Sequence, residues 1–148
     1  MNLVDANILI YAVNSNSAHH DRVRKWFESA LSGPDPLGLT WSVLIAFLRI
    51  TTRRGILERP LSVNDALAHV DTWLGQPCVE LVVPGPHHWT VLRTLVAASG
   101  TGGNLTSDAH LAALALEGGW TMVSTDRDFR RFAGIELLNP ALVDGSGE

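Results

Sequence analysis

Apolar residues along this chain fall into short blocks that alternate between the spacing of strands and the spacing of helices. Short, mostly apolar runs predict buried strands at 2–4, 37–41, 79–83, 121–124 and 135–138. Apolar residues at helical spacing, or filling a helix-length stretch, predict helices at 18–31, 43–51, 63–74, 89–98 and 105–116. The run at 8–13 holds no turn residues, so we expect the first strand to continue through it into a first helical turn.

Serine and glycine residues mark where several of these helices should begin and end. Ser42 and Ser62 each precede an apolar helical run, and a serine hydroxyl at an N-cap accepts a hydrogen bond from a free backbone N–H. Gly118 and Gly119 end the run at 105–116. The glycine-rich segment 100–104 predicts a flexible loop before that run.

The alternation of strands and helices predicts an α/β fold. We expect a central parallel sheet of four to five short strands, flanked by helices on both faces. A chain of 148 residues is long enough to bury a core without a staple, and no internal repeat or linker divides it. The sequence therefore predicts one domain over residues 1–148.

Composition narrows the classes of protein further. Hydrophobic residues make up 46% of the chain and charged residues 18%, which is typical of a folded protein rather than a disordered one. Cys78 is the one cysteine, which excludes an intramolecular disulfide and a cysteine-rich zinc site. The apolar run at 8–13 is too short to span a membrane, and no lysine or arginine precedes it. We expect a cytoplasmic protein without membrane contact.

The basic residues lie in groups although the net charge is −4. Ten of the eleven are arginines, and Lys25 is the only lysine. The groups are Arg22, Arg24 and Lys25; Arg49, Arg53, Arg54 and Arg59; and Arg127, Arg130 and Arg131. Arginine binds phosphate with two parallel hydrogen bonds, so these groups predict either a basic rim for nucleic acid or ordinary solvated helix faces.

Three aspartates occupy matching positions in the predicted topology. Asp5 ends the first strand, and Asp126 follows the strand at 121–124, so both should emerge at the carboxyl edge of a parallel sheet. Asp108 lies in the first turn of the helix that leads into that strand, which starts near the same edge. Each residue alone also fits a structural role, as an N-cap, a helix-start acid or a turn residue. Their joint placement favours one site.

A cluster of carboxylates indicates a bound cation. Like charges a few ångströms apart oppose joint ionisation, and a divalent cation removes that cost. Oxygen ligands without a histidine–cysteine pattern favour Mg²⁺ or Mn²⁺ over zinc, as one or two ions. Such ions activate water and stabilise the leaving oxygen of a phosphodiester.

The motifs around these aspartates resemble a known family. They are Leu3-Val4-Asp5-Ala6-Asn7, Thr106-Ser107-Asp108-Ala109-His110-Leu111-Ala112-Ala113-Leu114-Ala115 and Val123-Ser124-Thr125-Asp126-Arg127-Asp128-Phe129. Together, and over nearly the whole chain, they resemble the PIN-domain ribonucleases, and more closely the VapC toxins of bacterial toxin–antitoxin modules, especially the group expanded in mycobacteria.

This resemblance implies a PIN fold and Mg²⁺- or Mn²⁺-dependent endonucleolytic cleavage of transfer, ribosomal or messenger RNA, which inhibits translation. It also implies a homodimer and a cognate VapB-like antitoxin. The family's metal and catalytic roles fall on Asp5, Asp108 and Asp126, with Asp128 as a further metal ligand. The supporting or RNA-binding candidates are Asn7, Ser42, Arg49, Thr125 and Arg127.

One position departs from the family pattern. Such nucleases usually carry an acidic residue on the helix after the second strand, and here Ala46 stands at that place, with no carboxylate between Asp35 and Glu58. A hydroxyl such as that of Ser42, with waters, would then complete the shell. The alternative is an impaired or non-catalytic PIN-like module that binds RNA or protein.

Two other constellations carry less weight. An aspartyl-phosphate phosphotransfer domain needs a lysine near its late strands, whereas Lys25 lies in an early helix. The pairs His19-His20 and His87-His88 point about 100° apart within a helix, so we expect them to pack at helix starts. His110 should point away from Asp108 and serve at the surface or in the core.

Overall fold

Five short strands form one parallel sheet at the centre of the molecule. The computed structural model describes residues 1–100, 102–103 and 105–142. The strands are β1 (Asn2–Val4), β2 (Leu37–Leu39), β3 (Val79–Leu81), β4 (Thr121–Val123) and β5 (Leu137–Leu138). Their order in the sheet is β3-β2-β1-β4-β5, and every neighbouring pair is parallel. The predicted parallel sheet is confirmed.

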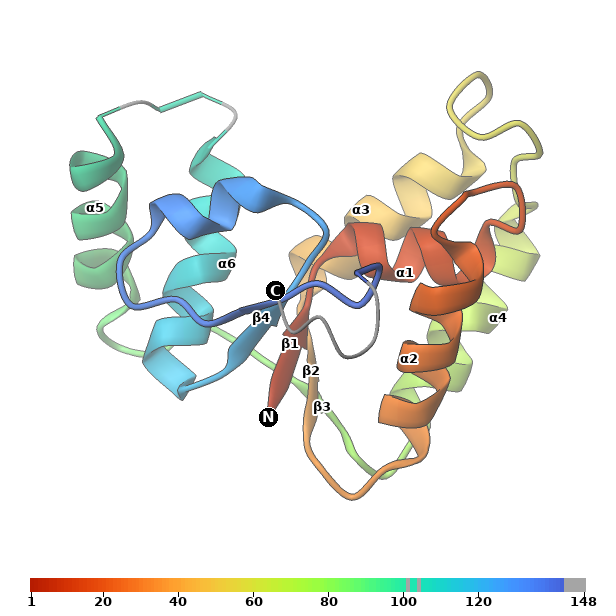
Figure 1. The fold of residues 1–148 in the computed structure, drawn as a ribbon, viewed down its shortest axis with the longest axis horizontal. Helices are drawn as coiled ribbons and strands as arrows, with labels where there is room; N and C mark the ends of the chain where they lie inside the picture. The colour runs from red at the N-terminus through yellow and green to blue at the C-terminus, as the bar shows by residue number, and fades with distance from the viewer. Residues whose placement is uncertain (101, 104, 143–148) are drawn as a thin grey trace.

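Helices cover both faces of this sheet. They are α1 (Ala6–Val13), α2 (His20–Ser32), α3 (Trp41–Thr52), α4 (Val63–Leu74), α5 (His88–Ser99), α6 (Leu105–Gly118) and the 3₁₀ helix η1 (Arg127–Arg131). Helices α1 to α4 lie on one side of the sheet, and α5, α6 and η1 lie on the other (Figure 1). The predicted α/β class with helices on both faces is confirmed. Along the described ranges, none of these helices combines the length and apolarity that crossing a lipid bilayer requires.

Burial of the central strands explains why their side chains are apolar on both faces. Leu3, Val4, Met122 and Val123 of β1 and β4 are all fully buried. Gly38 of β2 lies where a Cβ atom would come within 2.8 Å of Val82 Cγ2 and 2.9 Å of Leu3 Cδ1, so a larger residue has no space there. Strands β1 and β4 therefore end inside the core, and the residues that follow them emerge from closely packed surroundings.

The structure corrects several predicted boundaries. Residues 8–13 belong to helix α1 and not to a strand, because Asp5 caps a helix that begins at Ala6. Thr40, not Ser42, is the N-cap of α3: its Oγ1 accepts a hydrogen bond of 3.2 Å from Val43 N, and its backbone is extended at the end of β2. Strands β2 to β5 are also shorter than predicted, and the helix η1 was not predicted.

Other boundaries agree with the sequence pattern. Ser62 caps α4, with its hydroxyl accepting a bond from Asp65 N at 3.1 Å, as predicted. Helices α2, α5 and α6 lie within one or two residues of the predicted ranges. The predicted loop at 100–104 includes residues 101 and 104, which lie outside the described part of the chain.

Candidate functional site

The site begins where β1 and β4 end side by side. These strands pair in register, with Val4 opposite Val123, and the backbone N–H of Asp5 donates to Val123 O at 2.9 Å. Asp5 and Ser124 therefore emerge together from the carboxyl edge of the sheet, as predicted for Asp5. Asp5 then caps α1, because its Oδ1 accepts a bond of 2.7 Å from Ala6 N. Asp5 therefore caps α1 and also lies at the carboxyl edge of the sheet, where the site forms.

The Ser124 hydroxyl connects three parts of the site. It donates to Asp5 Oδ2 at 2.8 Å, and it accepts from Asn7 Nδ2 at 3.1 Å and from Asp126 N at 3.0 Å. Ser124 is fully buried, so all three partners are held without competition from bulk water. One hydroxyl has one proton and two lone pairs, and each is used here.

This network also sets the direction of the Asn7 amide. Because the Ser124 proton goes to Asp5, the hydroxyl can only accept from Asn7, so the amide must present its NH₂ group to Ser124. The Asn7 Oδ1 atom is then buried and has no hydrogen-bond partner within the described part of the chain. A buried carbonyl oxygen without a partner is costly, which marks this atom as a ligand or water acceptor.

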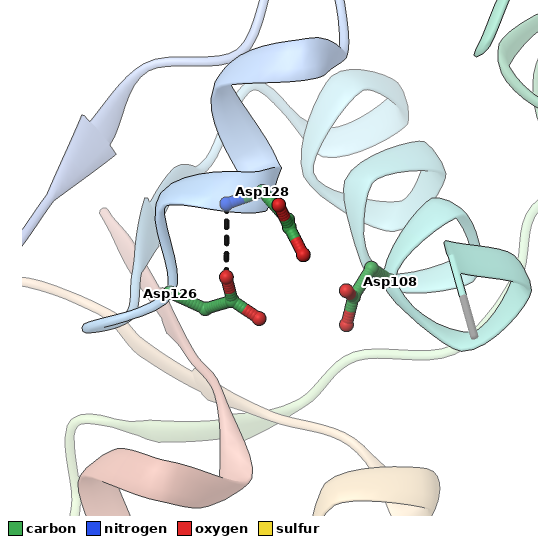
Figure 2. A group of neighbouring side chains, drawn as sticks. All are labelled: Asp108, Asp126 and Asp128. Atoms are coloured by element: carbon green, nitrogen blue, oxygen red, sulfur yellow. Dashed lines mark hydrogen bonds between the residues drawn. The ribbon is translucent and has the colours of Figure 1, made fainter.

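Three further carboxylates face one another beside this network. Oxygen atoms of Asp108, Asp126 and Asp128 all lie within 4.8 Å of one another. Figure 2 shows Asp108 reaching from the first turn of α6 towards Asp126 and Asp128 at the start of η1. Asp126 Oδ1 accepts a bond of 2.9 Å from Asp128 N, which fixes the turn between them. Asp128 also lies 3.5 Å from Arg131 Nε.

Burial, together with the charge of neighbouring acids, raises the pKa of Asp108 and of Asp5. Burial is the main cause that raises the pKa of Asp108 to about 6, and the charges of Asp5, Asp126 and Asp128 add to it. Burial also raises the pKa of Asp5, although its bonds from Ser124 and Ala6 N partly oppose the rise. The interaction of Asp5 with both Asp108 and Asp126 shows that the four acids share one electrostatic environment.

The donor set fits a hard divalent cation. Asp108, Asp126 and Asp128 offer carboxylate oxygens at the spacing of ligands around one or two ions. Asn7 Oδ1 is a buried neutral oxygen with no partner in the described residues, and the Asn7 amide is linked to Asp5 through the Ser124 hydroxyl. A bound cation would neutralise the repulsion that raises the pKa of Asp108. The residues present therefore suit Mg²⁺ or Mn²⁺.

The other predicted candidates lie at different distances from the acids. Thr125 is half-buried between Ser124 and Asp126, and Arg127 is exposed at the start of η1. Ser42 lies in the first turn of α3 and shares a 3.1 Å hydrogen bond with Thr40 Oγ1. Arg49 lies in the last turn of α3. At 1.5 Å per residue it stands about 13 Å along the helix from Thr40, away from the carboxyl edge.

Ser124 is the residue whose role the sequence analysis did not recognise. It stands within the motif around Asp126, and its position one residue beyond β4 matches that of Asp5 beyond β1. That equivalence indicates that Ser124 lies beside Asp5. The signal was weak because serine is also common in turns.

Comparison with known proteins identifies the family. A model of the PIN domain family matches residues 3–135. Ribonuclease VapC37 of Mycobacterium tuberculosis is 45% identical over 140 residues, which cover 95% of this chain and 97% of that protein. This chain belongs to the PIN-domain family of VapC ribonucleases. Ribonuclease VapC33 of the same organism is 39% identical over 140 residues, covering 95% of this VapC-family chain and 98% of the relative.

Solved structures show the same fold. VapC20 of M. tuberculosis, described as a toxin that cleaves the sarcin–ricin loop, superposes with a TM-score of 0.64 at 19% identity, over 92% of this VapC-family chain and 99% of its own. A chain of VapBC2 from Rickettsia felis, bound to a fragment of promoter DNA, gives a TM-score of 0.68 at 16% identity, over 93% and 97%. The family predicted from the motifs is confirmed.

Proposed function

We propose that this chain is a metal-dependent endoribonuclease that acts as the toxin of a toxin–antitoxin pair. The observation that carries the proposal is the group of Asp108, Asp126 and Asp128, with oxygens within 4.8 Å of one another, next to the network of Asp5. The curated relatives are named ribonucleases, which supports RNA as the substrate. The substrate proposed is transfer, ribosomal or messenger RNA.

Each residue of the site has a role in this proposal. Asp108, Asp126 and Asp128 would hold one or two divalent ions, and Asp5 and Asn7 Oδ1 would be further ligands of the ion or of its water. The bound metal supplies an activated water and stabilises the leaving oxygen of the phosphodiester. Ser124 fixes Asp5, Asn7 and the Asp126 backbone relative to one another. The rigid strand ends thus present the acids at fixed spacing.

Removal of the metal tests this function. We expect purified protein to cleave RNA in Mg²⁺ or Mn²⁺, to lose cleavage in EDTA, and to recover it when either ion is added back, because hard oxygen ligands bind these ions. Cleavage is measured on total RNA by sequencing of new 5′ ends. The Asp35→Asn variant is the control for losing an acid outside the site, since Asp35 is exposed in the loop that precedes β2. It should depend on the metal in the same way as the wild type.

Cleavage that persists in EDTA would contradict the metal dependence. Binding of RNA without cleavage under all conditions would favour the alternative, a non-catalytic PIN-like module, which Ala46 at the usual acidic position of α3 supports.

Arginines next to the acids are proposed to bind the RNA backbone. Arg127 and Arg130 lie on η1, the element that also carries Asp128, and both are exposed. We expect Arg127→Ala or Arg130→Ala to weaken RNA binding and to lower the slope of log K against log salt by about 0.7 for each lost contact with a single strand. Fluorescence anisotropy at several salt concentrations measures this on the Asp108→Asn protein.

A control arginine makes the salt test specific. Arg24 is exposed on α2 and pairs with Glu28 at 2.9 Å, so Arg24→Ala should leave the slope unchanged. Equal slopes for Arg24→Ala and the η1 variants would leave the η1 arginines without a role in RNA binding.

An apolar outer surface supports binding of protein partners. Trp41 and Ile45 of α3 are 55% and 60% exposed, and Val63 and Leu67 of α4 are 63% and 44% exposed. Both pairs have i, i+4 spacing, so each pair lies on one helix face. We propose that such surfaces serve a VapB-like antitoxin and a second copy of the chain in a homodimer, in the cytoplasm where the RNA substrates are.

A further inference from the structure

A chain of polar side chains joins α5 to α6 outside the acidic site. His88 Nδ1 lies 2.6 Å from Glu117 Oε2, and His88 Nε2 lies 2.9 Å from His110 Nδ1. The side chains of His88 and Glu117 are only 13% and 15% exposed. His88 does lie at the start of α5, but it bonds across the helix pair, which single-helix spacing could not reveal. His110 is half-buried between the two helices.

The geometry orders the protons of this chain. The Glu117 carboxylate accepts the Nδ1 proton of His88, which leaves a lone pair on His88 Nε2 when that ring is neutral. This lone pair faces His110 Nδ1. In metal sites, imidazole ligands are commonly oriented in this way: a carboxylate accepts one ring N–H, and the other ring nitrogen offers its lone pair to the metal.

The spacing of the two rings also suits a metal. Their centroids are 4.8 Å apart and their planes meet at 84°, so the two ring nitrogens face each other without stacking. A tetrahedral ion with bonds of about 2.0–2.1 Å holds two nitrogens about 3.3 Å apart. The nitrogens lie at the 2.9 Å of a hydrogen bond, so the site opens when the rings move apart by a few tenths of an ångström and turn their lone pairs towards the ion. Water would supply the remaining ligands of such an ion.

We propose that His88 Nε2 and His110 Nδ1 form a second cation site, specific for a transition ion such as Zn²⁺, with Glu117 orienting His88. Imidazole ligands favour Zn²⁺, Cu²⁺ or Ni²⁺, whereas the carboxylates of the acidic site favour Mg²⁺ or Mn²⁺. With both rings neutral, the proton on His110 Nδ1 moves to Nε2 and no net proton is released. The ion links α5 to α6, the helix that carries Asp108.

Gly85 packs closely against the carboxylate of Glu117. A Cβ atom on Gly85 would lie 3.1 Å from Glu117 Oε1, and Gly85 O accepts a bond of 3.2 Å from His88 N. The turn at 85–88 therefore packs against the carboxylate and positions His88 at the same time. This close packing holds Glu117 in the orientation that the site needs.

Zn²⁺ titration tests the site independently of RNA cleavage. The readouts are calorimetric binding in Mg²⁺-containing buffer and the rise in Tm when Zn²⁺ is added to each protein. We expect His88→Gln and His110→Gln to lose the binding, and Glu117→Gln to weaken it about 10- to 100-fold. His87→Gln, which changes the exposed neighbour of His88, should leave both readouts unchanged. Asp108→Asn should also leave Zn²⁺ binding unchanged.

Several results would overturn the site. These are no Zn²⁺ binding by the wild type, equal binding by the His88→Gln and His110→Gln variants, or loss of binding in Asp108→Asn alone, which would place zinc in the acidic centre. X-ray absorption of the zinc-loaded wild type covers the case of variants that fail to fold. It should show two imidazole ligands, and a spectrum with only oxygen ligands would refute the proposal.

Discussion

Replacing Asp108 with asparagine is expected to abolish RNA cleavage while stabilising the metal-free protein at neutral pH. Loss of a carboxylate ligand removes several kcal/mol of transition-state stabilisation, so we expect cleavage to fall by about 10³-fold or more. The asparagine has nearly the same shape but no charge, so the cost of burying a charge and the repulsion from Asp5, Asp126 and Asp128 both disappear. Cleavage assays and urea unfolding in EDTA measure the two effects.

The pH dependence of this stabilisation has a definite sign. The pKa of Asp108 is raised from 3.8 in the unfolded chain to about 6 in the folded protein, so the folded state holds its proton more tightly. As pH rises from about 4 to about 6, ionisation of Asp108 therefore costs the metal-free wild type stability, and the cost is complete above that range. We expect Asp108→Asn to be more stable by about 1 kcal/mol at pH 7.5, after allowance for solvent screening.

That advantage should disappear near pH 4 and should shrink in saturating Mg²⁺, which stabilises only the wild type. A variant that is less stable at pH 7.5 and still cleaves RNA at the wild-type rate would show that Asp108 is a structural residue. Asp35→Asn serves again as the matched control.

Ser124→Ala is expected to damage stability and cleavage together. The change leaves Asn7 Nδ2 and Asp126 N without their acceptor and Asp5 Oδ2 without its donor. All three atoms adjoin the Ser124 hydroxyl, and Ser124 is fully buried. Unpaired buried polar groups of this kind cost about 2–3 kcal/mol of unfolding free energy. Ser124 positions the acids through hydrogen bonds and is not itself a proposed metal ligand. Cleavage should therefore fall by about 10- to 100-fold rather than vanish.

Comparison with an exposed serine separates this role from a general effect of losing a hydroxyl. Ser32 is exposed and donates a single bond of 2.8 Å to Glu28 O, so Ser32→Ala should change stability by less than about 0.5 kcal/mol. Urea unfolding and cleavage rates at saturating Mg²⁺ provide the numbers. Equal behaviour of the two variants would mean that the Ser124 network does not position the acids.

Elements with a clear apolar pattern or a single good cap were predictable, whereas boundaries that depend on a choice between two elements or two caps were not. The strand at 2–4 is an apolar run whose last two residues are fully buried, and Ser62 is a good cap directly before an apolar helical run. The run at 8–13 is apolar enough for either a strand or a buried helix, and Asp5 decides for the helix by accepting a bond from Ala6 N. Thr40 and Ser42 are both good caps, and only the end of β2 selects Thr40.

The acidic site was predictable because topology alone brings its members together. Asp5 and Asp126 follow β1 and β4, which are neighbours in the sheet. Asp108 lies in the first turn of α6, the helix that precedes β4 in the sequence. The link through Ser124 required the orientation of one hydroxyl. The chain from Glu117 through His88 to His110 required knowledge of which faces of α5 and α6 meet. Sequence spacing within one helix carries no such information.

The pairing of β1 with β4 has a consequence during synthesis on the ribosome. Val4 is added 119 residues before its partner Val123. At 5–20 residues per second, about 6–24 s pass before the second half of the acidic group exists. A growing chain that has not yet reached β4 therefore lacks both the β1–β4 pair and the Asp126 and Asp128 carboxylates, so synthesis itself delays assembly of the acidic site.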